Sequence, residues 1–132
     1  MTREEVQTQL HQILIEAMDF EPSQLIPTAS LQGDLGIESI DLLDIQFRIE
    51  RMFKIQVGRD DLFPDDLLSD RSKCISGLFV TPYGVEQLKQ SMPFVNWATV
   101  KEPLKVTDLR NLYTIDTLVE FVSQKINLNV QV

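Results

Sequence analysis

The chain has 132 residues, of which 43% are hydrophobic and 24% are charged, and its net charge at pH 7 is −8. This composition is that of an ordinary globular domain and is not biased enough for disorder. No stretch approaches the roughly 18–20 apolar residues of a membrane-spanning helix, and the N-terminal sequence lacks the apolar run of a signal peptide. The one cysteine, Cys74, cannot form an internal disulfide, so we expect a cytoplasmic protein.

The negative charge is concentrated in residues 34–70, where ten acidic and four basic side chains leave a net charge of −6. Such a field repels nucleic-acid phosphates and anionic membrane surfaces and attracts basic protein surfaces. We therefore expect no nucleic-acid partner and no stable membrane insertion. A basic protein partner and a solvated acidic face without a partner both remain open.

The first predicted element is a helix over residues 3–18. Its apolar positions, from Val6 to Ala17, recur at the spacing of one buried helical face. Thr2 and Glu5 have the spacing of a capping box at its start. Two prolines then disfavour helix, so residues 19–38 are predicted to form a long ordered loop. Five apolar side chains should hold this loop to the core: Leu25, Ile26, Leu31, Leu35 and Ile37.

A second helix is predicted from about Ser39 to Phe53, with two apolar stripes. The core stripe consists of Leu42, Ile45, Ile49, Met52 and Phe53. The second stripe, Ile40, Leu43 and Phe47, falls on nearly the opposite side. Either later residues cover this second stripe, or it is a docking surface bordered by charged side chains.

The last helix begins after Thr114, a good N-cap, and has one stripe from Ile115 to Ile126. A shorter helix is predicted over residues 82–91, with Thr81 as cap and Pro82 in the first helical position. Ile55–Val57 and Phe79–Val80 are too short to build a sheet. The predicted fold class is therefore all-α, in one domain over residues 1–132.

Residues 60–107 contain more large apolar side chains than a solvated loop needs. We expect them to form a small satellite core that widens or covers a binding region, or that joins two copies of the chain. The side chains concerned are Leu62, Phe63, Leu67, Leu68, Leu78, Phe79, Phe94, Val95 and Trp97.

Ser39 stands where the second helix begins, and two roles fit it. It can be the N-cap, or its hydroxyl can carry an attached phosphate ester, which the free amides and positive dipole of a helix start would favour. Gly33 and Gly36 would keep the preceding loop from covering Ser39, so its hydroxyl would stay accessible to another protein's active site. Hydrolytic chemistry is disfavoured, because no G-x-S-x-G turn surrounds the serine and the only histidine, His11, lies in the first helix. We expect no catalytic residue and a protein that is not an enzyme.

No metal site is expected. The acidic run over residues 60–66 lacks the alternating oxygen ligands, the central glycine and the final glutamate of a calcium loop. Cys74 and His11 have no metal-ligand spacing to other residues.

The sequence from Asp34 to Asp41, DLGIESID, resembles the D-L-G-x-D-S-L-D signature of acyl carrier proteins. The order of first helix, long loop and second helix is similar too, as is YTIDTL over residues 113–118 at the start of the last helix. The resemblance covers roughly residues 1–60 and 107–128. It implies a four-helix acyl-carrier-like bundle, with an extra, partly helical insert at about residues 60–107. Residues 106–112 would be what remains of that family's third helix.

The resemblance implies covalent 4′-phosphopantetheine on Ser39, whose thiol holds acyl groups as thioesters for fatty-acid, lipid or polyketide-type biosynthesis. It implies loading by a holo-acyl-carrier synthase or another phosphopantetheinyl transferase. Ketosynthases, acyltransferases or ligases would then act on a stand-alone carrier. In that family the second helix is the recognition helix, so docking is expected at Glu38, Ile40, Asp41, Leu43, Asp44, Phe47 and Glu50.

The sequence departs from the family pattern in three places. Glu38 and Ile40 replace the usual aspartate and leucine, Arg48 and Arg51 interrupt a commonly more acidic helix, and residues 60–107 have no counterpart. The arginines suggest partners other than the housekeeping fatty-acid enzymes. Two alternatives stay open: an aminoacyl or peptidyl carrier, and an unmodified helical interaction module in which Ser39 only caps the helix.

Overall fold

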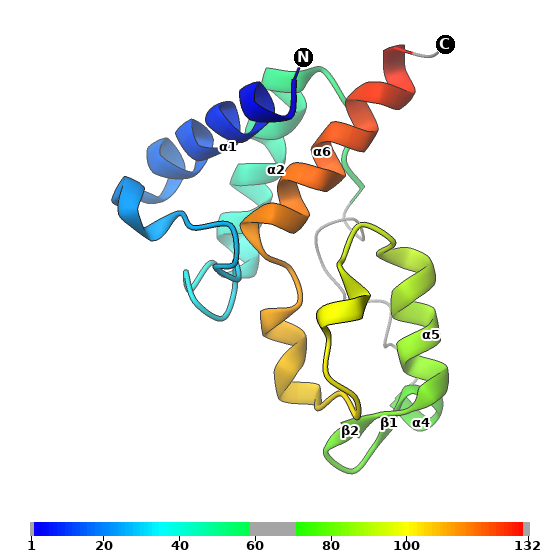
Figure 1. Ribbon diagram of the computed structural model, residues 1–132. Helices are drawn as coiled ribbons and strands as arrows, with labels where there is room; N and C mark the ends of the chain where they lie inside the picture. Colours follow the sequence, from blue (N-terminus) through cyan, green and yellow to red (C-terminus); the bar gives the residue numbers. More distant parts are fainter. Residues whose placement is uncertain (1, 59–70, 131–132) are drawn as a thin grey trace.

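The computed structural model describes residues 2–58 and 71–130, and its larger part is a group of three helices. These are α1 (Arg3–Met18), α2 (Ser39–Phe53) and α6 (Ile115–Val130). Helix α1 packs against both of the others. Figure 1 shows α2 behind α1, with α6 crossing beside them. The predicted all-α fold is confirmed, and so are the predicted bounds of the first two helices.

Local capping explains why α1 begins at Arg3. Thr2 has an extended backbone, and its hydroxyl accepts a hydrogen bond from the Glu5 amide at 3.2 Å. This interaction satisfies one of the free amides of the first turn. The helix ends at Asp19, which adopts a left-handed conformation with φ of 58°. The predicted capping pair therefore sets the start of the helix.

The segment between α1 and α2 is an ordered loop with one short 3₁₀ helix, η1 (Pro22–Gln24). Leu25, Leu31 and Ile37 are buried, as predicted, and Leu35 packs partly against the core. The prediction for Ile26 is wrong, since its side chain is 54% exposed. The Ile26 carbonyl accepts the Ala29 amide at 3.0 Å, and this turn buries the flanking apolar residues instead.

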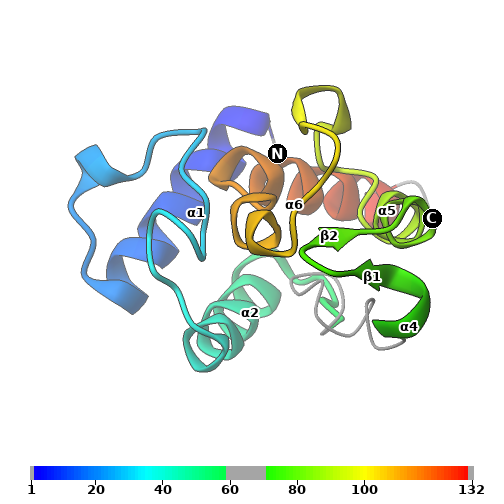
Figure 2. The ribbon, with the colours of Figure 1, turned by 90° about the horizontal axis from the view of Figure 1, so that it is seen from below.

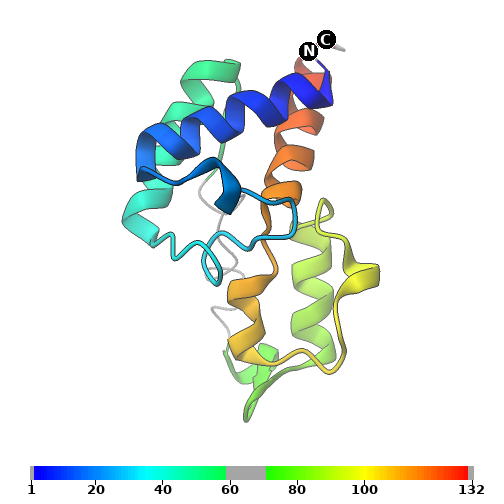
Figure 3. The ribbon, with the colours of Figure 1, turned by 60° about the vertical axis from the view of Figure 1, so that its left-hand side comes forward.

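The smaller part of the structure extends from residue 71 to the start of α6 and lies below the three helices in Figures 1 and 3. Its helices are α4 (Arg71–Cys74), α5 (Pro82–Ser91) and two 3₁₀ helices, η3 (Trp97–Thr99) and η4 (Val106–Asn111). The predicted helix over residues 82–91 is confirmed, with Thr81 accepting the Gly84 amide at 3.1 Å. The expected remnant of a third helix, residues 106–112, corresponds to η4. Figure 2 shows this part from below.

This smaller part also contains a two-stranded antiparallel hairpin. Strand β1 (Ile75–Ser76) pairs with β2 (Phe79–Val80), and the turn between them contains Gly77 with φ of 62°. A glycine suits that left-handed position because it has no Cβ. The hairpin is too short to give the alternating pattern by which longer strands are predicted.

The buried apolar side chains of both parts form one continuous core. Phe94 connects them, because its ring meets the edges of Tyr113, at a centroid distance of 5.9 Å, and Phe121, at 5.0 Å. The predicted satellite core is correct for Val95, which is buried, and for the partly buried Phe94 and Trp97.

Two members of that predicted core are exposed instead. Leu78 is 76% exposed and Phe79 is 38% exposed, because both lie at the end of the hairpin, beyond the core. Leu62, Phe63, Leu67 and Leu68 lie outside the described residues, as does the acidic run over residues 60–66.

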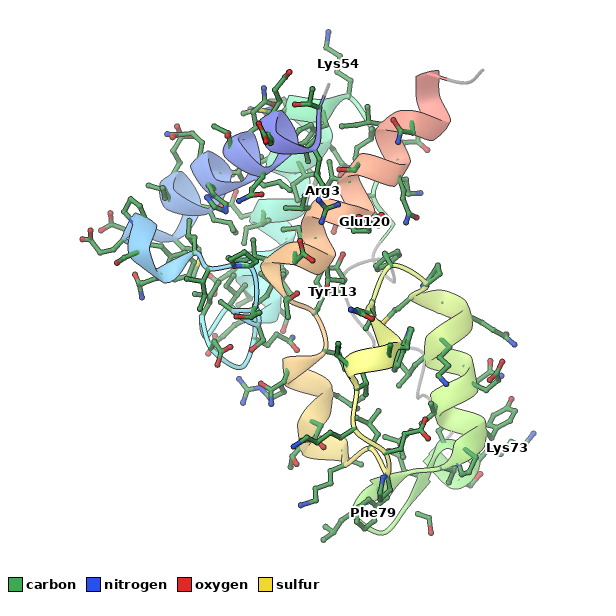
Figure 4. The ribbon with its side chains drawn as sticks, viewed as in Figure 1. Arg3, Lys54, Lys73, Phe79, Tyr113 and Glu120 are labelled. Carbon is green, nitrogen blue, oxygen red and sulfur yellow. The ribbon has the colours of Figure 1, made fainter. Side chains whose placement is uncertain are left out.

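Ion pairs connect the start of α1 to α6. Arg3 pairs with Asp116, at 2.7 Å, and with Glu120, and Figure 4 shows the Arg3 and Glu120 side chains meeting between the two helices. Hydrogen bonds from Gln124 and Arg3 lower the pKa of the Glu120 carboxyl. All three side chains of the cluster are at least 40% exposed, so we expect them to contribute little to stability.

Candidate functional site

Helix α2 is capped by Glu38, not by Ser39. The Glu38 backbone is extended, its carbonyl accepts the Leu42 amide at 3.0 Å, and its amide donates to Asp41 Oδ2 at 3.0 Å. Ser39 is therefore the first residue inside the helix. The interpretation of Ser39 as N-cap is wrong by one position, because the acidic pair Glu38 and Asp41 forms the capping box.

The Ser39 side chain is consequently available for chemistry. It is exposed, and its hydroxyl forms no hydrogen bond with any residue in the described ranges. It lies in the first turn of α2, where backbone amides lack acceptors within the helix and the helix dipole is positive. An anionic ester is favoured at such a position. The arrangement can hold a phosphate ester, and it offers no hydrogen-bonded base for the hydroxyl among the described residues.

The loop before Ser39 is held against η4 and the start of α6. Ser30 is buried, its hydroxyl contacts Asn111 Oδ1 at 3.3 Å, and it accepts the Asp34 amide at 2.8 Å. Asp34 Oδ2 in turn accepts the Ser30 amide at 2.9 Å. The Leu31 amide donates to the Tyr113 carbonyl at 2.8 Å. The smaller part of the structure thus fixes the loop that leads to the serine.

Each of the two glycines of this loop has its own structural reason. A Cβ on Gly33 would lie 1.9 Å from Asn111 Oδ1, so any larger residue would have to displace the Asn111 side chain. Gly36 has φ of +67° and open space around it, so its requirement is conformational. Sequence patterns do not point to Ser30 or Asn111, because a serine 81 residues from its partner gives no local signal.

The second apolar stripe of α2 faces solvent. Ile40 is 78%, Leu43 47% and Phe47 66% exposed, so residues 71–107, the described part of the insert, do not cover the stripe. Leu42, Ile45, Ile49 and Phe53 are buried as predicted. Met52 was also predicted to be buried but is 43% exposed, and it lines a shallow groove of about 240 Å³ with Ile13 and Arg48.

The acidic residues beside this stripe differ in whether their carboxylates already accept hydrogen bonds from the backbone. Asp41 is engaged by the Glu38 amide, and Glu50 Oε2 accepts the Val57 amide at 3.3 Å. Asp44 is exposed and pairs with Arg48 at 3.1 Å. The predicted docking acids therefore include two that also stabilise backbone, whereas Glu38 and Asp44 present more of their side chains to solvent.

The remaining chemically reactive side chains form no second centre. Within residues 2–58 and 71–130, no group of three His, Cys, Asp or Glu side chains could hold a metal ion. Cys74 is a free, buried thiol. His11 lies in the middle of α1, where burial lowers its pKa. No helix of the described chain has the length and apolar character to cross a bilayer.

Residues 8–68 match the model of a family described as "Phosphopantetheine attachment site". The matched segment contains α2, the capped helix start and Ser39, and extends into residues that the structure does not describe. The match covers a little under half of the chain, and it supports a phosphopantetheine-carrying protein of the acyl carrier family. The cofactor that such an attachment site takes is covalent 4′-phosphopantetheine, and carrier domains of this kind interact with phosphopantetheinyl transferases and with biosynthetic enzymes.

The residues present fit this cofactor. The attachment of 4′-phosphopantetheine needs an exposed hydroxyl beside a site that tolerates a phosphodiester, and the unbonded Ser39 hydroxyl at the start of α2 provides both. When bound, the group supplies a thiol on which cargo is held as a thioester.

Proposed function

We propose that Ser39 carries the 4′-phosphopantetheine and that the protein delivers acyl groups, held as thioesters, to biosynthetic enzymes. The observation that carries this proposal is the exposed hydroxyl of Ser39 in the first turn of α2. Glu38 and Asp41 cap this turn, so the cap does not use the serine hydroxyl. The residues of this chain present the serine, stabilise its ester and bind partners. Bond-making steps belong to the enzymes that come to the carrier.

The exposed stripe Ile40, Leu43 and Phe47 supports docking of these enzymes directly beyond the serine. Apolar residues at the centre of a binding patch with charged residues around them are typical of protein interfaces. Glu38 and Asp44 border the stripe and favour an enzyme with a basic surface. Tethering would raise the effective concentration of the cargo at each active site.

The proposed cargo is an acyl chain for fatty-acid, lipid or polyketide-type biosynthesis, in a reducing cytoplasm where Cys74 stays a thiol. An aminoacyl or peptidyl carrier would use the same serine and the same helix start. Incubation of the loaded protein with purified acyl-ligating and aminoacyl-adenylating enzymes distinguishes the two cargoes by intact mass. We expect the acyl adduct to form.

The attachment site is tested by co-expression with a broad-specificity phosphopantetheinyl transferase, followed by intact-mass measurement. We expect one phosphopantetheine increment on the wild type and none on Ser39→Ala. Ser23→Ala is a matched control, because Ser23 is an exposed serine in η1, and this variant should be loaded like the wild type. An increment that survives Ser39→Ala, or no increment on the wild type, contradicts the proposal.

A further inference from the structure

The hairpin end of the smaller part is an exposed apolar surface flanked by lysines. Leu78 is 76%, Phe79 38% and Tyr83 50% exposed. Lys73 and Lys105 are also exposed: Lys73 is close to these residues in the sequence, and Lys105 forms a backbone bridge with Phe79. We call these five residues the hairpin tip. Neither lysine forms an ion pair with a residue of the described ranges. The carrier function described above does not use this surface.

Backbone pairing brings the apolar and basic members of the tip together. Phe79 forms an antiparallel bridge with Lys105, and the Val106 amide donates to the Leu78 carbonyl at 2.9 Å. Directly opposed residues in antiparallel strands place their side chains on the same face, so Phe79 and Lys105 share one face of this bridge. Thr81 hydrogen-bonds the Cys74 carbonyl, which holds α4, with Lys73, against the start of α5.

Charge is segregated along the chain. Residues 71–107 contain five basic and two acidic side chains, a net charge of +3, whereas residues 2–58 contain four basic and ten acidic side chains, a net charge of −6. Residues 59–70 add a net charge of −4 and lie outside the described ranges. At physiological ionic strength, charges more than about 8 Å apart are largely screened from each other. A surface that meets the hairpin tip is therefore affected mainly by its two lysines and by Asp108, whose carboxylate accepts the Lys105 amide at 3.1 Å.

The hairpin tip projects at one end of the molecule. Figure 1 shows the hairpin at the bottom and both ends of the described chain at the top. Figure 4 places Phe79 and Lys73 at this lower end and Lys54 at the upper end. Helix α2 begins at its lower end, so Ser39 lies on the end of α2 that is nearer to the hairpin.

We propose that the hairpin tip docks the protein on an anionic lipid surface. A leucine and a phenylalanine that project beyond the core, with a tyrosine around them and two lysines that have no ion pair within the described ranges, have the composition of segments that insert shallowly at a charged bilayer interface. A second copy of the chain is a poorer occupant. A stable interface buries about 800 Å² of surface on each partner. The tip does not offer that area, because each strand of its hairpin has only two residues.

Docking at the tip would turn the Ser39 end of α2 toward the lipid. Carried groups would then be presented beside the membrane without any membrane-spanning segment of the described chain. Docking itself does not require modification of Ser39, so it can be tested on the unmodified protein, independently of the carrier proposal.

The test is co-sedimentation of the full chain, as the Ser39→Ala variant, with vesicles of pure phosphatidylcholine and with vesicles containing about one third phosphatidylglycerol. We expect binding to the anionic vesicles only, and its loss at high salt. Leu78→Ser and Phe79→Ser should each lower the partition coefficient about tenfold. Lys73→Gln and Lys105→Gln should each lower it about fivefold.

Two variants at other exposed positions serve as matched controls. Ile26→Ser removes an apolar side chain that is 54% exposed in the loop after α1, and Lys54→Gln removes an exposed lysine at the other end of the molecule. Neither should change partitioning. Equal binding to both kinds of vesicle, binding to neither, or equal effects of control and tip variants would overturn the proposal. Concentration-dependent self-association of the wild type without vesicles, abolished by Leu78→Ser, would assign the tip to a second copy instead.

Discussion

The amide of Glu38 donates a hydrogen bond to Asp41 Oδ2, so the two acids that flank Ser39 hold the helix start, while the serine hydroxyl bonds to none of the described residues. This relationship separates two roles that the sequence places at a single residue. Stability of the helix start depends on the acids, and the serine can be modified without loss of the cap.

Replacement of Asp41 should therefore cost stability, and replacement of Ser39 should not. We expect Asp41→Ala to lower the free energy of unfolding by about 1 kcal/mol, the usual cost of losing a cap. Ser39→Ala should stay within about 0.5 kcal/mol of the wild type. Urea unfolding followed by circular dichroism measures both. A cap-sized loss in Ser39→Ala would show that the serine hydroxyl holds the helix start after all.

Gly33 should be sensitive to substitution because of Asn111. Gly33→Ala places a Cβ against Asn111 Oδ1 and should destabilise the protein by about 1–3 kcal/mol. Asn111→Ala should recover part of that loss in the double variant. Gly36→Ala is the control, since its cost of about 1–2 kcal/mol comes from a positive φ and should add to that of Asn111→Ala. Additive behaviour at Gly33 would contradict the observed contact.

The two faces of α2 should respond differently to truncation. Ile45→Ala removes a buried side chain and should lower the free energy of unfolding by about 2–5 kcal/mol. Phe47→Ser alters an exposed side chain and should leave stability within about 0.5 kcal/mol of the wild type, while it slows loading by the phosphopantetheinyl transferase. Unfolding curves and the time course of the mass increment measure these effects. Unfolding of the Phe47→Ser protein would show that the stripe stabilises the fold, which would contradict its assignment as a docking surface.

Phe94 should couple the two parts of the structure. Phe94→Leu keeps an apolar side chain but loses the ring contacts with Tyr113 and Phe121, each worth about 0.5–1.5 kcal/mol beyond burial. Phe79→Leu is the matched control, because Phe79 makes no ring contact with another described aromatic residue, and its effect on stability should be near zero. Thermal unfolding of the two variants gives the comparison. Equal melting temperatures would show that the ring contacts do not stabilise the junction.

Because of His11, stability should fall as the pH is lowered through the window that begins near the ordinary histidine pKa of about 6.5. Burial lowers the pKa of this histidine below its ordinary value of about 6.5, so the unfolded chain binds the proton more tightly than the folded one. The free energy of unfolding therefore decreases as the pH falls through this window. The measurement is urea unfolding at several pH values. His11→Gln should flatten the pH dependence, and an unchanged slope would assign it to other groups.

Features set by neighbouring residues were predictable from the sequence. The bounds of α1, α2 and α5 follow from caps and periodicity within a few residues of each helix start, as at Thr2 and Thr81. The exposed stripe of α2 also followed from helical spacing, since Ile40, Leu43 and Phe47 lie opposite the buried positions.

Features set by contacts between distant segments were not predictable. Met52 and Ile26 are apolar at positions that suit burial, but nothing in the fold covers them fully. The contact between Ser30 and Asn111 joins residues 81 positions apart, and periodicity carries no signal for it. The N-cap of α2 was misplaced by one residue, because N-cap preferences favour serine over glutamate, whereas the observed Glu38–Asp41 hydrogen bond places the cap at Glu38.

Helix α6 belongs to both parts of the core, since it packs on α1 and also receives the ring of Phe94. During synthesis on the ribosome, neither part can therefore bury its apolar side chains fully until residues as late as Phe121 have left the exit tunnel. The Arg3–Asp116 pair spans 113 positions of sequence, and contacts of such separation slow folding. A nascent chain that lacks α6 would leave exposed the apolar side chains of α1 that α6 covers in the folded protein.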